Sequence, residues 1–387
     1  MIWSPVLVGP VKDVASQKIR EIADIIRNKD HHTNRHGLMT GNAGEALFLY
    51  YYCFWTGNDE FYDIASERFM DGVEHNTVSL TSSTSPLNLH ASFYDGISGV
   101  GWGIAHLLTH QIIEGEISDT MGTVEPWLYR RMIYDTQQNR LDLLQGAAGI
   151  GLYAVRRDNR LTKEYLRRFV KELSCAVFEK QDYDSGTDYS IAKGIGAMIL
   201  LLIKIGVEYP DMPEVQVLLD YFGKRLAARI QDLLCTKVLL DNKELGWRDR
   251  VLGTLWVALC CRAVNPTLCE DLIERVILEY HKQITDSIPF DSGMAGGLIS
   301  AAHIMNRIYH LTGNRTCREF ARILYEKEIE AATFIDPSSG YNVWLTESDG
   351  FYGIHTGLLN GLAGIGLALM AAVSDNEPVW DECLMLS

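Results

Sequence analysis

Six aspartates are the residues that could most directly supply acid and base chemistry. They are Asp95, Asp142, Asp182, Asp184, Asp188 and Asp291. Two carboxylates placed on either side of a glycosidic bond can hydrolyse it, one as acid and the other as base or nucleophile. Acidic loop residues also cap helices or face water. The pattern alone therefore leaves carboxylate chemistry and a structural role both open.

The spacing of cysteines and histidines argues against a local metal motif. The eight cysteines are scattered and none forms a C-x-x-C pair: Cys53, Cys175, Cys235, Cys260, Cys261, Cys269, Cys317 and Cys383. This excludes zinc-ribbon and thioredoxin-type patterns and favours reduced thiols. The His-rich stretch 30–36 could bind a metal, but a solvated loop leading into the first glycine motif is the simpler interpretation. His303 and His310 are seven residues apart on a predicted helix, too far to bind one metal together.

The charge of the chain narrows the classes of partner. It has 387 residues and a formal net charge of −15 at pH 7. Such acidity disfavours nucleic acid and anionic membrane surfaces but is compatible with a basic peptide. The apolar runs are too short or too interrupted to span a membrane, and residues 1–5 do not resemble a signal peptide. We therefore expect a cytoplasmic protein without membrane insertion.

A glycine-rich motif recurs along the chain and organises it. Close copies occupy 96–101, 146–151 and 361–366, looser copies occupy 41–44, 194–197 and 293–296, and a degenerate copy ends at Gly253. The copies are separated by about 50 residues, and a fixed period of this size indicates a repeat architecture. Small residues at a helix start allow backbones to approach closely.

Each motif opens an apolar segment, and a polar-faced helical segment precedes or follows it. The apolar segments start near 44, 98, 148, 194, 251, 295 and 361, and the amphipathic ones lie near 11–28, 59–75, 122–134, 162–180, 213–234, 268–286 and 314–331. An all-round apolar helix is buried, and an amphipathic one covers it. We expect an all-α barrel of inner and outer helices, one domain over 1–387 with repeats from about 11 to 372. Residues 78–91 and 335–356 are predicted loops.

The seven glycine-led repeats, and above all the run 358–369 (LLNGLAGIGLAL), resemble the lanthionine synthetase C-like proteins. The resemblance covers residues from about 40 to 372 and implies an (α/α)7 toroid. Family members bind a precursor peptide and add its Cys thiols to dehydroalanine or dehydrobutyrine, which closes thioether rings. One branch carries an inserted SH2-like subdomain, for which the repeat spacing here leaves no room.

The resemblance also implies a zinc site, whose ligands this chain has replaced. In the family, two Cys and one His bind Zn²⁺, which lowers the pKa of the substrate thiol. In the motif W-C-Y-G, Trp247 matches the Trp and Arg248 stands at the Cys position. In the motif C-H-G, Asp291 stands at the Cys position and Ser292 at the His position. We therefore expect no zinc cofactor.

The other site positions implied by the resemblance are partly kept. Asp142, ahead of the third glycine motif, matches a catalytic aspartate, although it can also be a helix N-cap. Asp95 is interpreted as its counterpart one repeat earlier. Lys193 takes the place of a His that is an acid/base candidate, and Glu244 the place of an Arg. His355, before the last inner helix, is positioned to reach the mouth of the ring.

Arg248 and Asp291 suggest a replacement for the metal. Arg and Asp form bidentate charge pairs, so we predict a salt bridge with head groups within about 4 Å, tying repeats five and six as zinc does in the family. The sequence thus favours a pseudo-cyclase that binds a dehydrated, Cys-containing precursor peptide, working with a dehydratase or another modification enzyme.

Two other functions stay open. One is zinc-independent thioether formation, in which Lys193 lowers the pKa of a thiol and Asp142 handles the proton. The other is carboxylate chemistry on a glycan, because helical-hairpin barrels are similar to a class of glycosidases that use paired carboxylates. Ring closure in the presence of a chelator, or turnover on glycans, distinguishes these from peptide binding alone.

Overall fold

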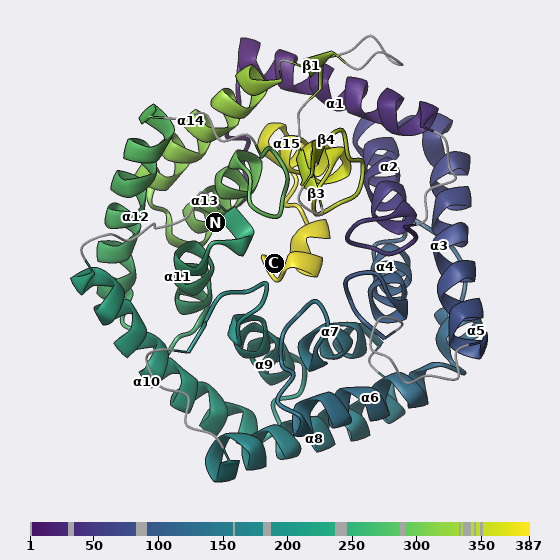
Figure 1. Ribbon diagram of the computed structural model, residues 1–387, viewed down its shortest axis with the longest axis vertical. Helices are drawn as coiled ribbons and strands as arrows, with labels where there is room; N and C mark the ends of the chain where they lie inside the picture. The colour runs from purple at the N-terminus through teal and green to yellow at the C-terminus, as the bar shows by residue number, and fades with distance from the viewer. Residues whose placement is uncertain are drawn as a thin grey trace.

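The structure is a computed structural model, and it shows a closed ring of helices in two layers (Figure 1). The residues that it describes are 2–29, 35–82, 91–157, 159–180, 187–236, 246–286, 291–332, 334–335, 342–343, 346–348 and 351–387.

Within the described residues, the inner layer consists of seven apolar helices that surround the ring axis. They are α2 (Asn42–Thr56), α4 (Ile97–Thr109), α7 (Ala147–Arg157), α9 (Gly196–Glu208), α11 (Arg250–Cys260), α13 (Leu298–Thr312) and α15 (Leu362–Val373). Each of them contacts the next, and α15 returns to α2, so the layer closes on itself. A helix that is apolar nearly all round must be buried on all its faces. The outer layer of helices buries the faces that point away from the ring axis.

The outer layer consists of amphipathic helices that alternate with the inner ones along the chain. They are α1 (Pro10–Asn28), α3 (Tyr62–Ser82), α6 (Glu125–Gln137), α8 (Arg160–Cys175), α10 (Pro213–Cys235), α12 (Pro266–Asp286) and α14 (Arg315–Ala331). In α8, for example, Leu166, Phe169 and Leu173 are buried at helical spacing while the opposite face is charged. The two layers confirm the all-α (α/α)7 toroid.

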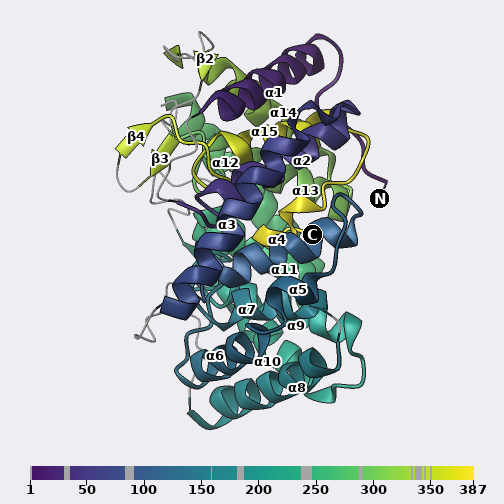
Figure 2. The ribbon, with the colours of Figure 1, turned by 90° about the vertical axis from the view of Figure 1, so that its right-hand side faces the viewer.

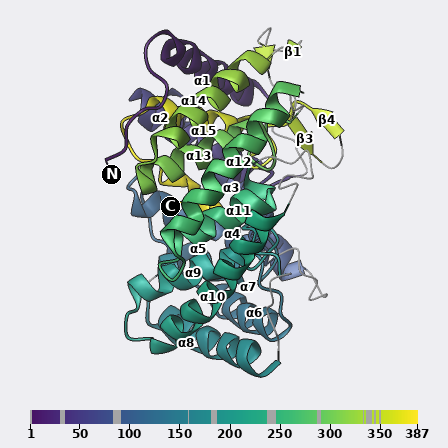
Figure 3. The same ribbon diagram turned by 90° about the vertical axis from the view of Figure 1, so that its left-hand side faces the viewer.

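Short elements complete the chain. They are α5 (Ile117–Met121), η1 (Asp59–Phe61), η2 (Ala176–Lys180), η3 (Gly246–Arg248), η4 (Trp380–Leu384), and the strands β1 (Phe334–Ile335), β2 (Asn342–Val343), β3 (Thr346–Ser348) and β4 (Phe351–Gly353). Among the described residues, the strands form two antiparallel pairs, which lie in the stretch predicted as loop except for Phe334. In Figures 2 and 3, β3 and β4 lie on one side of the ring and the N-terminal end of the chain on the other.

One predicted loop begins later than expected. Residues 78–82 belong to α3, not to the predicted loop 78–91. The prediction followed the Ser and Thr content of this stretch, but α3 packs along α2, and tertiary packing outweighs weak helix propensity. Within the described residues, no helix has the length and apolarity needed to cross a membrane.

The glycine motifs have a common steric role at the start of the inner helices. A Cβ at Gly364 would lie 2.0 Å from the carbonyl oxygen of Leu358, and one at Gly149 would lie 2.2 Å from that of Leu143. Both carbonyls belong to the residue six positions earlier, in the loop that enters the helix. Only glycine permits this approach, so the motif specifies how each loop turns into its inner helix.

Candidate functional site

Main-chain hydrogen bonds connect the loops that precede six of the inner helices. The N–H of Arg248 donates to Ala295 O (2.8 Å), Ala295 N–H to Leu359 O (2.8 Å), Leu359 N–H to Met39 O (2.7 Å), Met39 N–H to Tyr94 O (3.0 Å) and Tyr94 N–H to Leu144 O (3.0 Å). We call this series the loop belt. It gathers the loops that carry the predicted site residues Asp95, Asp142, Arg248 and Asp291 at one end of the ring.

Within the loop belt, Arg248 and Asp291 point to the same small volume. A Cβ at Gly296 would lie 3.4 Å from Nη2 of Arg248 and 3.7 Å from Oδ2 of Asp291. The other oxygen of Asp291, Oδ1, accepts the N–H of Gly293 at 2.8 Å. Two of the three family zinc positions therefore converge beside a residue that has no side chain. The salt-bridge distance of about 4 Å stays a prediction.

A buried glutamate stands behind these residues. Glu328 of α14 is 0% exposed, and the side chain of Ser292 lies near its carboxyl group. Burial, together with the charge of Asp291, raises the pKa of Glu328 to about 8. The sequence analysis missed Glu328. The available signal was its spacing on α14, because Phe320, Leu324 and Glu328 follow one another at intervals of four on the buried face.

The residues at the family zinc positions do not fit zinc. The guanidinium of Arg248 carries a positive charge and repels a cation. Asp291 already uses one oxygen on the main chain, and the side chain of Ser292 lies near Glu328. Zinc sites in proteins are built from thiolate, imidazole and carboxylate donors, and among the three side chains at these positions only that of Asp291 belongs to this set.

Asp95 lies in the loop belt with its carboxyl group largely shielded. Its Oδ1 accepts a hydrogen bond from Oγ1 of Thr40 at 2.6 Å. Burial raises the pKa of Asp95 above its ordinary value, although the Thr40 hydroxyl and the Arg35 charge oppose the change. Burial and Asp95 also raise the pKa of Tyr94, and the charges of Arg35 and Arg248 oppose this rise. The positive charges of Arg35 and Arg248 therefore both influence Tyr94 in the loop belt.

Asp142 has a structural role as well as a shifted pKa. Its Oδ1 accepts the N–H of Gln145 at 2.8 Å, which holds the turn that leads into α7. Burial raises its pKa. The predicted equivalence with Asp95 is wrong, because Asp142 lies four residues before its helix-start glycine, Gly146, and Asp95 lies one residue before Gly96. The position of Asp142 corresponds to that of Gly293, four residues before Gly297.

Lys193 and Trp247 are placed differently from the predicted site residues described above. Lys193 is exposed in the loop before α9, and that loop packs on α11, where a Cβ at Gly253 would lie 3.2 Å from the Ile191 nitrogen. Trp247 is 0% exposed and donates its indole N–H to Leu384 O at 2.9 Å, so it lies beneath the loop belt and does not line an open pocket.

The last of the predicted site residues are His355 and four carboxylates. His355 is partly buried, and its carbonyl accepts the N–H of Leu362 at the start of α15. Asp188 accepts the Ser190 N–H at 2.9 Å and lies 3.4 Å from Arg250, a structural arrangement. Glu244, Asp182 and Asp184 lie outside the described residues.

Comparison with known proteins agrees with this fold. A family model described as "Lanthionine synthetase C-like protein" matches residues 32–219, which supports the resemblance seen in the glycine-led repeats. Among solved structures, a nisin cyclase is similar, with a TM-score of 0.63 and 14% sequence identity, over 97% of this chain and 98% of that one. No curated protein matches the sequence.

Proposed function

We propose that this chain binds a Ser/Thr-dehydrated, Cys-containing precursor peptide at the loop belt and does not carry out zinc-dependent thioether cyclisation. One observation carries the proposal. Arg248 and Asp291, at the family zinc positions, converge beside Gly296 with a donor set unsuited to zinc. The peptide partner, and a dehydratase acting before it, follow from the chemistry of the family.

The residues of the loop belt can orient a peptide more readily than they can activate one. The guanidinium of Arg248 can donate hydrogen bonds to a peptide carbonyl or attract a thiolate, but it cannot lower a thiol pKa as a Lewis acid does. Asp95, whose pKa burial raises, and Tyr94 supply further polar contacts nearby. These groups support binding and positioning of a peptide.

Peptide binding can be measured with a fluorescent synthetic peptide that contains one Cys and dehydroalanine residues. We expect Arg248→Met and Gly296→Val each to weaken binding about tenfold, because one removes the central donor and the other fills the volume beside it. Arg250→Met is the matched control. It changes an exposed arginine two residues away, and we expect affinity within about twofold of wild type. Equal affinities for all three variants would contradict the assignment of the site.

Metal content tests the other half of the proposal. We expect the wild-type protein, purified without added metal, to contain far less than one zinc per chain. The triple variant Arg248→Cys, Asp291→Cys and Ser292→His restores the donor set of the family and should bind about one zinc. One equivalent of zinc in the wild type would refute the proposal. Ring closure of the dehydrated peptide by the wild type in the presence of a chelator would instead establish zinc-independent cyclisation.

A further inference from the structure

Residues 380–387 lie inside the ring, where Figure 1 shows η4 near its middle. We call them the axial segment. Leu384 and Leu386 are 0% exposed. The repeat pattern predicts no role for this segment, because it follows the last repeat. Its contacts come from five successive inner-layer repeats and resemble those by which a protein recognises a peptide.

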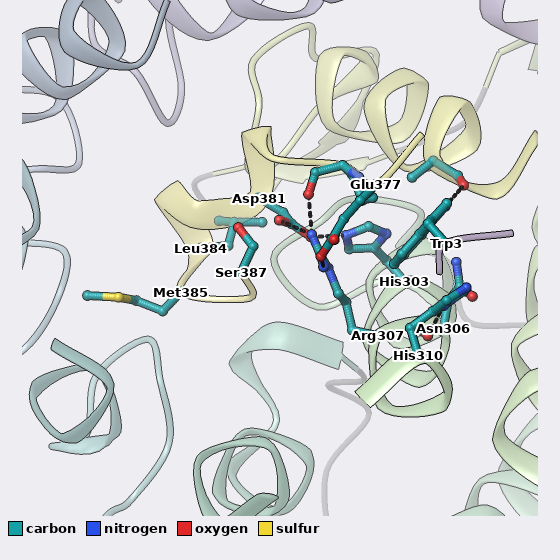
Figure 4. A network of polar contacts seen from close by, with 12 residues as sticks. Trp3, His303, Asn306, Arg307, His310, Glu377, Asp381, Leu384, Met385 and Ser387 are labelled. Atoms are coloured by element: carbon teal, nitrogen blue, oxygen red, sulfur yellow. Dashed lines mark hydrogen bonds and ion pairs between the residues drawn. The ribbon is translucent and has the colours of Figure 1, made fainter. Parts of the chain in front are cut away.

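The first carboxylate of the axial segment is held by α13. Arg307 donates from Nε to Oδ2 of Asp381 and from Nη2 to Oδ1, both at 2.7 Å, and Nε2 of His303 lies 2.7 Å from Oδ2 (Figure 4). The side chains of Arg307 and Asp381 are 5% and 0% exposed. Burial alone would raise the pKa of Asp381, but Arg307 and His303 hold it at about 2. This is bidentate recognition of an anion that stays charged.

The second carboxylate is held by three other inner helices. Glu382 accepts hydrogen bonds from Nε of Arg156 at 2.6 Å and from Nζ of Lys204 at 3.2 Å, and Nδ1 of His106 lies 3.9 Å away. These residues belong to α7, α9 and α4. In a chain with a net charge of −15, the inner wall of the ring thus presents basic side chains to two adjacent acidic residues.

The main chain of the axial segment is recognised by two indoles. Trp247 donates to Leu384 O and Trp256 donates to Met385 O, both at 2.9 Å. Both indoles are buried. Contacts to main-chain carbonyls hold a peptide irrespective of its side chains, whereas the pockets for the two carboxylates require Asp and Glu.

A short exposed stretch connects the axial segment to the ring. Asp375, Asn376 and Glu377 are exposed between α15 and η4. Glu377 also accepts a hydrogen bond from Nη1 of Arg307 at 2.6 Å. The axial segment therefore enters the interior through a tether that can be cut without touching its buried contacts.

We propose that the interior of the ring is a binding site for an acidic peptide, one with adjacent Asp and Glu followed by apolar residues, and that the axial segment occupies this site in cis. The site favours an acidic occupant because its charges are complementary to those of the axial segment. The cationic side chains are Arg307, Arg156 and Lys204, and the carboxylates are Asp381 and Glu382. The inference does not depend on the function proposed for the loop belt, because it concerns a different part of the ring.

The test uses the full chain with a specific protease sequence inserted between Asp375 and Asn376. After cleavage of the folded protein, we expect the fragment to remain bound during gel filtration and to exchange with a labelled synthetic peptide of residues 376–387. An Asp381→Asn peptide should compete on the order of 100-fold less well, because it leaves the buried Arg307 with only the exposed Glu377 carboxylate as a partner. A Ser387→Ala peptide is the matched control, since that side chain is exposed, and should compete like the native sequence.

Three results would overturn the proposal. The fragment could leave a cleaved protein whose circular dichroism is unchanged, which would mean that the ring does not recognise it. The Asp381→Asn peptide could compete as well as the native one. The cleaved protein could unfold, or retain a fragment that never exchanges, and the axial segment would then be part of the folded core and not a ligand.

Discussion

The pH dependence of unfolding tests whether Glu328 is buried as a neutral acid. In the folded chain the carboxyl group of Glu328 has a pKa of about 8, against an ordinary value of 4.5. Because the folded state binds more protons than the unfolded state in this window, the free energy of unfolding falls as pH rises through it. The fall is at most about 1.4 kcal/mol per pH unit and reaches about 3–4 kcal/mol between pH 5 and pH 8.

The substitution Glu328→Gln isolates this contribution. Gln keeps the size of the side chain and can hydrogen-bond to Ser292, but it carries no titrating proton. We expect urea unfolding, followed by circular dichroism, to give similar stabilities for variant and wild type at pH 5. At pH 8 the variant should be more stable by about 3–4 kcal/mol. Other titrating groups are common to both proteins and cancel in the comparison.

The control is Glu330→Gln, an exposed position on the same helix, which should keep the wild-type pH dependence. Asp291→Asn should make that dependence shallower, because the Asp291 charge contributes to the raised pKa of Glu328. Parallel pH profiles for Glu328→Gln and wild type would show that Glu328 is not held as a neutral acid, and the reasoning about the Ser292 environment would fail.

Three further stability predictions follow from described contacts, each measured by urea unfolding at pH 7. Asp381→Asn should cost about 3–5 kcal/mol because it leaves the buried Arg307 with only the exposed Glu377 carboxylate as a partner, and the double variant with Arg307→Met should recover part of that loss. Gly364→Ala should cost roughly 2–3 kcal/mol, because its Cβ would meet the Leu358 carbonyl, and a neutral effect would contradict the steric role of the motif. Asp249→Ala should cost about 1 kcal/mol, since Asp249 caps α11 through the N–H groups of Val251 and Leu252.

The fold could be predicted because its causes are local in the sequence. The contact between Gly364 and the carbonyl of Leu358 involves residues six positions apart, and the same contact recurs at Gly149. The alternation of apolar and amphipathic segments then specifies two layers. Helix extents were harder to predict, as α3 shows, because residues 78–82 are helical despite their Ser and Thr content, and the packing of α3 against α2 is not visible in the local sequence.

The candidate site was only partly predictable, because its geometry depends on distant parts of the chain. The positions of Arg248 and Asp291 followed from the family motif, and the structure brings both beside Gly296. Glu328 comes from another helix, so no motif near Ser292 reveals it. Asp381 and Arg307 are 74 positions apart, and only the folded ring places the axial segment between its helices.

The loop belt bears on how such a ring can change over evolutionary time. Its bonds join main-chain groups, such as Arg248 N–H to Ala295 O and Ala295 N–H to Leu359 O. Main-chain groups are the same whatever side chain is attached, so closure of the ring does not depend on the identity of residues such as Arg248. Mutations can therefore accumulate at the mouth without opening the scaffold. A lineage can in this way lose the donors of a metal centre one by one while each intermediate sequence still folds.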